Sequence, residues 1–207
     1  MKVDSLEFLF PDGCQAWKYD EFLFFKRLSN AFQFRCECEQ CPSRECRKGN
    51  CSDFGSCSRR KTYDGLKGID LILQQEHELI LIEVKDYRRQ TNPPLEHIAD
   101  EVAKKFRDTL FGLWTGSIFS DQDEERNRLC AWRSASQDIR LVFHFESPMV
   151  PYTSGLYPKG QLVPLELMAR MLKRRLGPWG SKLEVVNAET LHAHRSHFGW
   201  SVLEARN

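Results

Sequence analysis

The 207 residues are long enough for one domain, and contents of 41% hydrophobic and 12% aromatic residues provide for a packed core rather than a disordered chain. A formal net charge of +1 excludes a strongly basic protein, so attraction to a nucleic acid has to come from a local patch. No apolar run approaches the roughly 18 residues that cross a bilayer, and the first residues lack a secretory signal, so a cytoplasmic protein without membrane contact is expected.

The first predicted element is a short strand over residues 6–10, ended by the turn signal Pro11-Asp12-Gly13. Residues 14–34 follow as a predicted helix, because at 100° per residue one face collects Trp17, Phe24, Phe25, Leu28 and Phe32. Glu21 falls in the middle of that face. A buried, unpaired carboxylate is costly, so Glu21 is expected beside a wet cleft or a cationic partner.

Residues 35–61 break every periodic pattern. They are rich in Cys, Arg, Lys, Ser and Gly and nearly free of aliphatic side chains, so they cannot bury a core of their own. We interpret them as a metal-ordered insertion within a single domain that covers residues 1–207.

Two apolar runs give the strongest β signal. Residues 68–73 and 79–85 are nearly continuous in Ile and Leu, which is typical of strands covered on both faces, and the polar residues 74–78 join them. The short connection predicts an antiparallel hairpin.

Residues 95–113 predict a long helix with one apolar face. Its other face receives Asp100, Glu101, Lys104, Arg107 and Asp108, and neither Lys105 nor Arg107 is assigned to a site. Residues 120–136 predict a loop with some helix, 138–145 a strand, 165–176 a helix and 183–186 a last strand. This order predicts an α/β fold with a mixed sheet flanked by helices.

The hairpin places acidic and basic groups together. Asp70 lies early in one strand and Glu83 late in its partner, so both carboxylates can reach one point, and Lys85 projects from the same face as Glu83. The Val84 carbonyl lies between them. Hard oxygen ligands of this kind suit Mg²⁺ or Mn²⁺, and such a cluster can support phosphodiester hydrolysis.

Gly-Ile-Asp before an apolar strand, followed after a turn by Ile-Glu-Val-Lys, resembles the core motif of the PD-(D/E)XK nuclease superfamily, which includes restriction enzymes and Holliday junction resolvases. The resemblance covers roughly residues 14–34 and 60–146 and implies a restriction-endonuclease-like αβββαβ core. It also implies that Asp70 and Glu83 hold the metal, that Lys85 positions the nucleophilic water, and that Glu21 is the acidic residue of the first helix.

The sequence departs from that pattern in places. Residues 58–63 are the only candidate for the first core strand, Ile69 stands where the family name has proline, and the cysteine-rich stretch and everything after Phe145 fall outside the core. A structural salt bridge between Lys85 and Asp70 or Glu83 is the plain alternative to a catalytic site.

Six closely spaced cysteines predict a metal site in the insertion: Cys36, Cys38, Cys41, Cys46, Cys51 and Cys57. Spacings of two to four residues let thiolates share one tetrahedral Zn²⁺, so one structural zinc held by four of the six is the first interpretation. A two-metal cluster, an iron–sulfur cluster and disulfides remain alternatives.

Basic residues accompany these cysteines: Arg44, Arg47, Lys48, Arg59, Arg60 and Lys61. They could hold a phosphate backbone close to Asp70 and Glu83, or form a solvated charged loop.

Three functions follow as hypotheses. The first is a Mg²⁺-dependent endonuclease acting on DNA in restriction, phage defence or recombination, as a homodimer or with a partner ATPase or helicase. The second is a catalytically inactive nucleic-acid-binding or scaffold module on the same fold. The third is a small regulatory zinc protein with an incidental acidic cluster. The intact Asp70, Glu83 and Lys85 favour the first.

Overall fold

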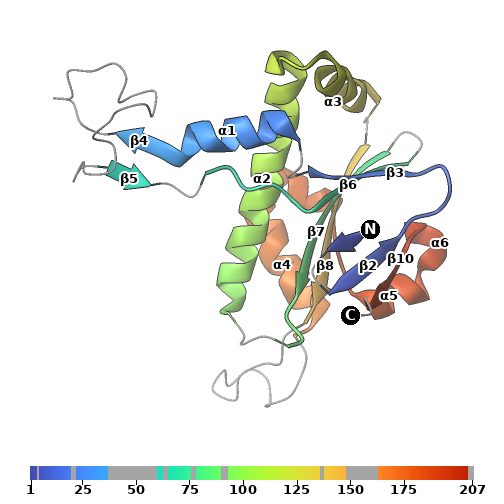
Figure 1. Cartoon of the computed structure of the whole chain (residues 1–207). Coiled ribbons are helices and arrows are strands. Elements are labelled where there is room, and N and C mark those ends of the chain that lie inside the picture. Colours follow the sequence, from blue (N-terminus) through green and yellow to red (C-terminus); the bar gives the residue numbers. More distant parts are fainter. Residues whose placement is uncertain are drawn as a thin grey trace.

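A mixed five-stranded sheet forms the centre of the molecule (Figure 1). The structure, a computed structural model, describes residues 1–3, 5–19, 22–36, 60–62, 65–75, 78–89, 93–135, 138–147 and 163–204. The strand order is β3-β6-β7-β8-β9, with β3 (Gln15–Lys18), β6 (Leu71–Gln75), β7 (Glu78–Asp86), β8 (Asp138–Glu146) and β9 (Leu183–Val186). The first two pairings are antiparallel and the last two are parallel. The predicted α/β fold with a mixed sheet is therefore confirmed.

The predicted hairpin is present as β6 and β7, whose register pairs Leu71 with Ile82 and Gln75 with Glu78. Their apolar side chains alternate between two cores, because successive residues of a strand point to opposite faces. Ile72, Leu79 and Leu81 enter one core, and Leu71, Leu73, Ile80 and Ile82 enter the other. Burial on both faces explains why the two runs are almost continuously apolar.

Helices cover the first face. They are α1 (Leu23–Gln33), α2 (Leu95–Phe119), α3 (Asp123–Ala135) and α4 (Leu165–Leu176). Val102 and Phe106 of α2 are fully buried against the sheet, and Met168 and Leu172 of α4 join the same core. The helices predicted over 95–113 and 165–176 are confirmed. Residues 120–136 were expected to be a loop with some helix, and most of them form the regular helix α3.

A small sheet and two short helices cover the second face. The sheet has the order β1-β2-β10, with β1 (Lys2–Val3), β2 (Leu6–Leu9) and β10 (Ser201–Glu204), so both ends of the chain meet there. The 3₁₀ helix η4 (Gly177–Lys182) leads into β9, and α5 (Ala188–Ala193) and α6 (Arg195–Phe198) follow it. Phe8 and Trp200, both 1% exposed, fill the core beneath.

The predicted helix over residues 14–34 is wrong in its first part. Gln15–Lys18 form strand β3 on the free edge of β6, with Ala16 opposite Leu73 and Trp17 opposite Ile72. Helix α1 begins only at Leu23. The backbone groups at the edge of β6 are satisfied by this pairing, and that long-range gain overrides a local helical pattern.

The expected first core strand at residues 58–63 is also wrong. Residues 60–62 form β5 (Arg60–Thr62), which pairs antiparallel with β4 (Phe34–Cys36) in a separate two-stranded sheet at the end of α1 (Figure 1). Strand β3, and not β5, lies beside β6 in the central sheet. Within the described ranges, no helix has both the length and the apolar character needed to span a membrane.

Candidate metal and phosphodiester site

Asp70 lies where the ladder between β6 and β7 ends. The last pair is Leu71 with Ile82, and Asp70 bends away from the strand. Its carboxylate continues the ladder instead, because Asp70 Oδ2 accepts a 2.7 Å hydrogen bond from the backbone N–H of Val84. One carboxylate oxygen is thereby fixed, and Oδ1 is left to face the neighbouring charges.

The segment before Asp70 is anchored to α2. The N–H of Lys67 donates to Asp108 Oδ2 at 2.9 Å, and the N–H of Ile69 donates to Thr109 Oγ1 at 3.0 Å. Gly68 fits between these anchors because a Cβ there would lie 2.7 Å from Tyr19 Cδ1. The Gly-Ile-Asp sequence thus packs closely and sets the position of the Asp70 carboxylate.

Glu83 presents a fully buried carboxylate on the face of β7 that α2 covers. Burial, followed by repulsion from Asp70, raises the pKa of Glu83 to about 8, although Lys105 and Lys85 oppose that shift. Its Oε2 has no hydrogen-bond partner within the described ranges. A cation bound beside Glu83 would offset the free-energy cost of burying its charged carboxylate.

Lys85 lies two residues beyond Glu83 and on the same face, as the sequence predicted. Its Nζ is 3.6 Å from Glu83 Oε1 and 3.1 Å from Glu101 Oε1. Burial opposes the ammonium charge, but the carboxylates of Glu83 and Glu101 outweigh it and raise the pKa of Lys85 above its usual range. Lys85 is therefore protonated at neutral pH, which suits it to orient a water or a phosphate oxygen rather than to remove a proton.

Lys105 of α2 belongs to the same cluster, and the sequence analysis did not assign it. Its Nζ lies 2.7 Å from Glu83 Oε1 and 3.6 Å from Asp70 Oδ1. Glu101, expected on the outer face of the helix, points to Lys85 instead. The four-residue spacing of Glu101 and Lys105 shows in the sequence that the two residues share one helix face. Only the structure shows that this face of α2 lies toward the sheet.

The donors present fit a divalent cation in part. Two carboxylates converge on one ammonium group, and a buried Glu83 oxygen has no hydrogen-bond partner in the described part of the chain. Mg²⁺ commonly takes one or two carboxylates and keeps several waters, so Asp70 and Glu83 suffice, with the Val84 carbonyl as a further expected ligand. In the described ranges, no group of three or more His, Cys, Asp or Glu residues could hold a metal.

Several predicted site residues lie outside the described residues. Glu21 is one of them, so its relation to Asp70 and Glu83 stays a prediction. The same holds for five cysteines and four basic residues: Cys38, Cys41, Cys46, Cys51, Cys57, Arg44, Arg47, Lys48 and Arg59. Cys36 ends β4, and Arg60 and Lys61 lie on β5, where the backbone alone is described.

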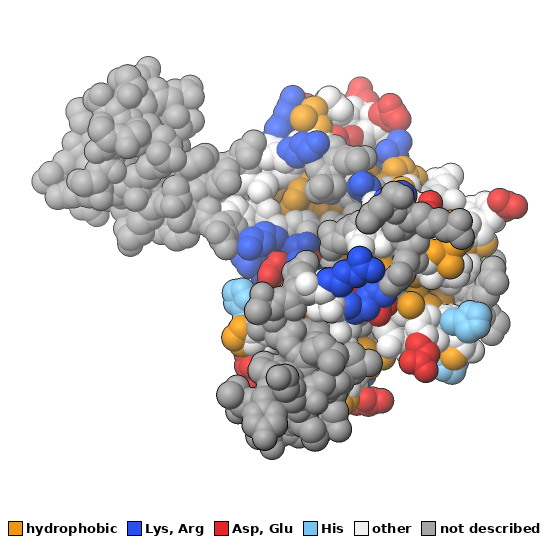
Figure 2. All heavy atoms as spheres, turned by 60° about the horizontal axis from the view of Figure 1, so that its bottom comes forward, with side chains coloured by type: hydrophobic (Ala, Val, Ile, Leu, Met, Phe, Trp, Pro, Cys, Tyr) orange, Lys and Arg blue, Asp and Glu red, His pale blue; other side chains and the backbone are white. Residues whose placement is uncertain are grey.

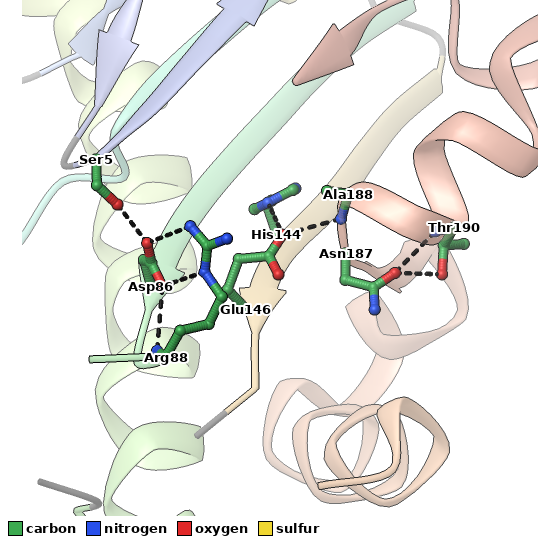
Figure 3. Close-up of polar contacts among 8 residues, drawn as sticks. All are labelled: Ser5, Asp86, Arg88, His144, Glu146, Asn187, Ala188 and Thr190. Atoms are coloured by element: carbon green, nitrogen blue, oxygen red, sulfur yellow. Dashed lines mark hydrogen bonds and ion pairs between the residues drawn. The ribbon is translucent and has the colours of Figure 1, made fainter. Parts of the chain in front are cut away.

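A second polar cluster occupies the opposite face at the ends of β7 and β8 (Figure 3). Asp86 accepts hydrogen bonds from Ser5 and from Arg88, whose Nε lies 2.9 Å from Oδ1. Glu146 Oε1 lies 2.9 Å from His144 Nε2 and accepts the Ala188 N–H at 2.9 Å. These contacts tie the small sheet and α5 to the central sheet, so we read the cluster as structural.

Comparisons with known proteins give one partial relative. No family model matches the chain, and no solved structure matches it significantly. The chain is 30% identical over 166 residues to a cysteine–tRNA ligase from Neisseria meningitidis serogroup A, and the match covers 74% of this chain but 22% of that protein. The chain thus spans about a fifth of the length of the curated relative it matches.

Proposed function

We propose that this chain is a divalent-metal-dependent nuclease that hydrolyses phosphodiester bonds, with DNA as the first substrate to test. The observation that carries the proposal is the convergence of Asp70, Glu83 and Lys85 at one end of the sheet. The same convergence supports, as a proposal, the restriction-endonuclease-like core that the Gly-Ile-Asp and Ile-Glu-Val-Lys motifs resemble.

Each residue has a chemical role in this proposal. Asp70 and Glu83 would hold Mg²⁺ or Mn²⁺, which when bound polarises a phosphate and lowers the pKa of an attacking water. Lys85, kept charged by Glu83 and Glu101, would orient the water or stabilise the negative phosphate. The hydrogen bond from Val84 N–H keeps the Asp70 carboxylate aligned for this task.

Surface charge is consistent with a polyanionic substrate. Figure 2 shows the end of the molecule that lies at the bottom of Figure 1, where β7 ends, and Lys and Arg side chains gather near its middle. Because phosphate contacts by basic side chains supply much of nucleic-acid affinity, these basic groups would hold a phosphate backbone laid across this end.

The cysteine-rich stretch fits the proposal as a metal-ordered nucleic-acid contact. Strands β4 and β5 pair with each other, with Cys36 opposite Arg60, and this pairing of the flanking strands supports an insertion. We expect about one zinc per chain by elemental analysis of protein purified from the cytoplasm. Iron with acid-labile sulfide would favour the iron–sulfur alternative. The absence of both zinc and iron would favour disulfides.

RNA belongs in the substrate panel because the partial relative is named as a tRNA ligase. The test is a cleavage assay on plasmid, single-stranded and double-stranded oligonucleotides and tRNA, with Mg²⁺ or Mn²⁺. The Asp70→Ala and Lys85→Ala variants should each lose at least about 100-fold in rate. Glu124→Gln, which alters a carboxylate on α3 with an 89% exposed side chain, should cut like the unaltered chain.

The proposed nuclease function would be refuted if no substrate were cut, or if all variants cut at the same rate. Retained nucleic-acid binding without cutting would then support the alternative of an inactive binding or scaffold module. Sedimentation with and without oligonucleotide would show whether a homodimer forms, and cutting that needs nucleotide hydrolysis would point to a partner ATPase or helicase.

A further inference from the structure

We propose that Lys105 competes with the divalent cation for the Asp70–Glu83 pair and leaves that pair when the cation binds. The inference rests on the proposed function, because it assumes that these carboxylates take a metal. It adds a residue outside the Asp70, Glu83 and Lys85 triplet and assigns it a control over metal affinity.

The contacts of Lys105 are those of a bridging cation. Its ammonium lies 2.7 Å from Glu83 and 3.6 Å from Asp70, and its side chain is 14% exposed. A metal ion bound to the same two carboxylates would place at least two further positive charges beside that ammonium. Like charges at such short range repel strongly where solvent is largely excluded, so both cannot keep these contacts.

Lys105 can leave while its helix stays in place. Val102 and Phe106 on either side of it are fully buried, so α2 is held by its core contacts. The lysine side chain is a flexible four-carbon stem, and its ammonium can move by rotation of the stem alone. Lys85 keeps Glu101 as a second partner 3.1 Å away, so we expect it to remain when Lys105 moves.

Lys104 provides a matched control on the same helix. Its ammonium pairs with Asp108 at 2.6 Å and with the Gly65 carbonyl at 2.9 Å, away from the two carboxylates. A lysine-to-methionine change there removes one charge of the same kind from α2 without removing a contact to Asp70 or Glu83.

The first experiment is a Mn²⁺ titration of the full chain, followed by the spin-resonance signal of free Mn²⁺. Lys105→Met should bind Mn²⁺ about 10-fold more tightly than the unaltered chain, within the usual range of coupling between two sites. Lys104→Met should leave the affinity unchanged, and Glu83→Gln should abolish this binding in either background.

The second experiment uses the unaltered chain, so it does not depend on how the methionine variant folds. Acetylation of individual lysines is followed by mass spectrometry with and without Mg²⁺. The rate at Lys105 should rise several-fold with Mg²⁺, while the rate at Lys104 stays constant. In Glu83→Gln, Mg²⁺ should leave the Lys105 rate unchanged.

The proposal and the function on which it rests fail in different ways. Equal Mn²⁺ affinities in the unaltered chain and Lys105→Met, with no change in Lys105 acetylation, would overturn the competition while metal-dependent cutting could persist. The absence of any Mn²⁺ binding that depends on Glu83 would overturn both.

Discussion

Glu83 couples the folding of this protein to pH. Its pKa is about 8 in the folded chain against an ordinary value of 4.5, mainly because it is buried and secondly because Asp70 repels its charge. A raised carboxyl pKa means that the folded state binds the proton more tightly than the unfolded state does. Without divalent metal, the contribution of Glu83 to stability therefore falls as the pH rises from about 4.5 to about 8.

Glu83→Gln should remove the loss of stability that accompanies rising pH. In EDTA at about pH 8.5, the variant should be more stable than the unaltered chain by roughly 1–4 kcal/mol, and the difference should shrink toward the acidic end of the window. Urea unfolding at several pH values measures this. Glu124→Gln, with its exposed side chain, should leave the pH dependence unchanged, and an unchanged slope in Glu83→Gln would contradict the burial argument.

At the scale of elements, α2 positions the acidic site through Thr109. The Thr109 hydroxyl accepts the buried Ile69 N–H, and Ile69 directly precedes Asp70. Thr109→Val keeps the shape but leaves that N–H without a partner, which should cost about 1–3 kcal/mol and slow cutting by shifting Asp70.

Thr115→Val is the control for that change. The Thr115 hydroxyl donates an exposed hydrogen bond of 2.8 Å to the Phe111 carbonyl of its own helix, so its loss should change stability by less than about 0.5 kcal/mol. Urea unfolding and single-turnover cutting of both variants make the comparison. Equal effects of the two substitutions would show that the Ile69 bond does not position the site.

The hairpin could be predicted from the sequence because both faces of β6 and β7 are buried, which leaves a continuous apolar signal around Asp70 and Glu83. Strand β3 could not, because Trp17 fits both a helical face and a strand, and its pairing with Ile72 is a long-range contact. Lys105 could not either, since only the packing of α2 on the sheet determines which of its polar residues face Glu83.

At the scale of the whole molecule, the cluster around Asp86 joins the two sheets. The hydrogen bond from Arg88 lowers the pKa of Asp86 most strongly, with a further contribution from Ser5 against the effect of burial. A lowered carboxyl pKa contributes stability that is present above the unfolded value of 3.8 and is lost as the pH falls below it.

Asp86→Asn should therefore destabilise the chain at neutral pH by about 1–3 kcal/mol, because it removes charge-assisted hydrogen bonds. The difference should narrow as the pH falls below 3.8, because Asp86 then binds a proton in the unfolded chain while it stays ionised in the folded chain. Asp123→Asn, on an 81% exposed side chain, should show neither effect. A loss of stability that is constant with pH would contradict the electrostatic origin.

The proposed chemistry depends on one physical claim, that Asp70 and Glu83 together bind a divalent cation. Anomalous scattering from crystals soaked in Mn²⁺ tests it most directly. We predict one peak within about 2.5 Å of an oxygen of each carboxylate, and no such peak in crystals of Glu83→Gln. Mn²⁺ bound elsewhere in the chain, with the Asp70–Glu83 pair unoccupied at saturating concentration, would contradict the claim.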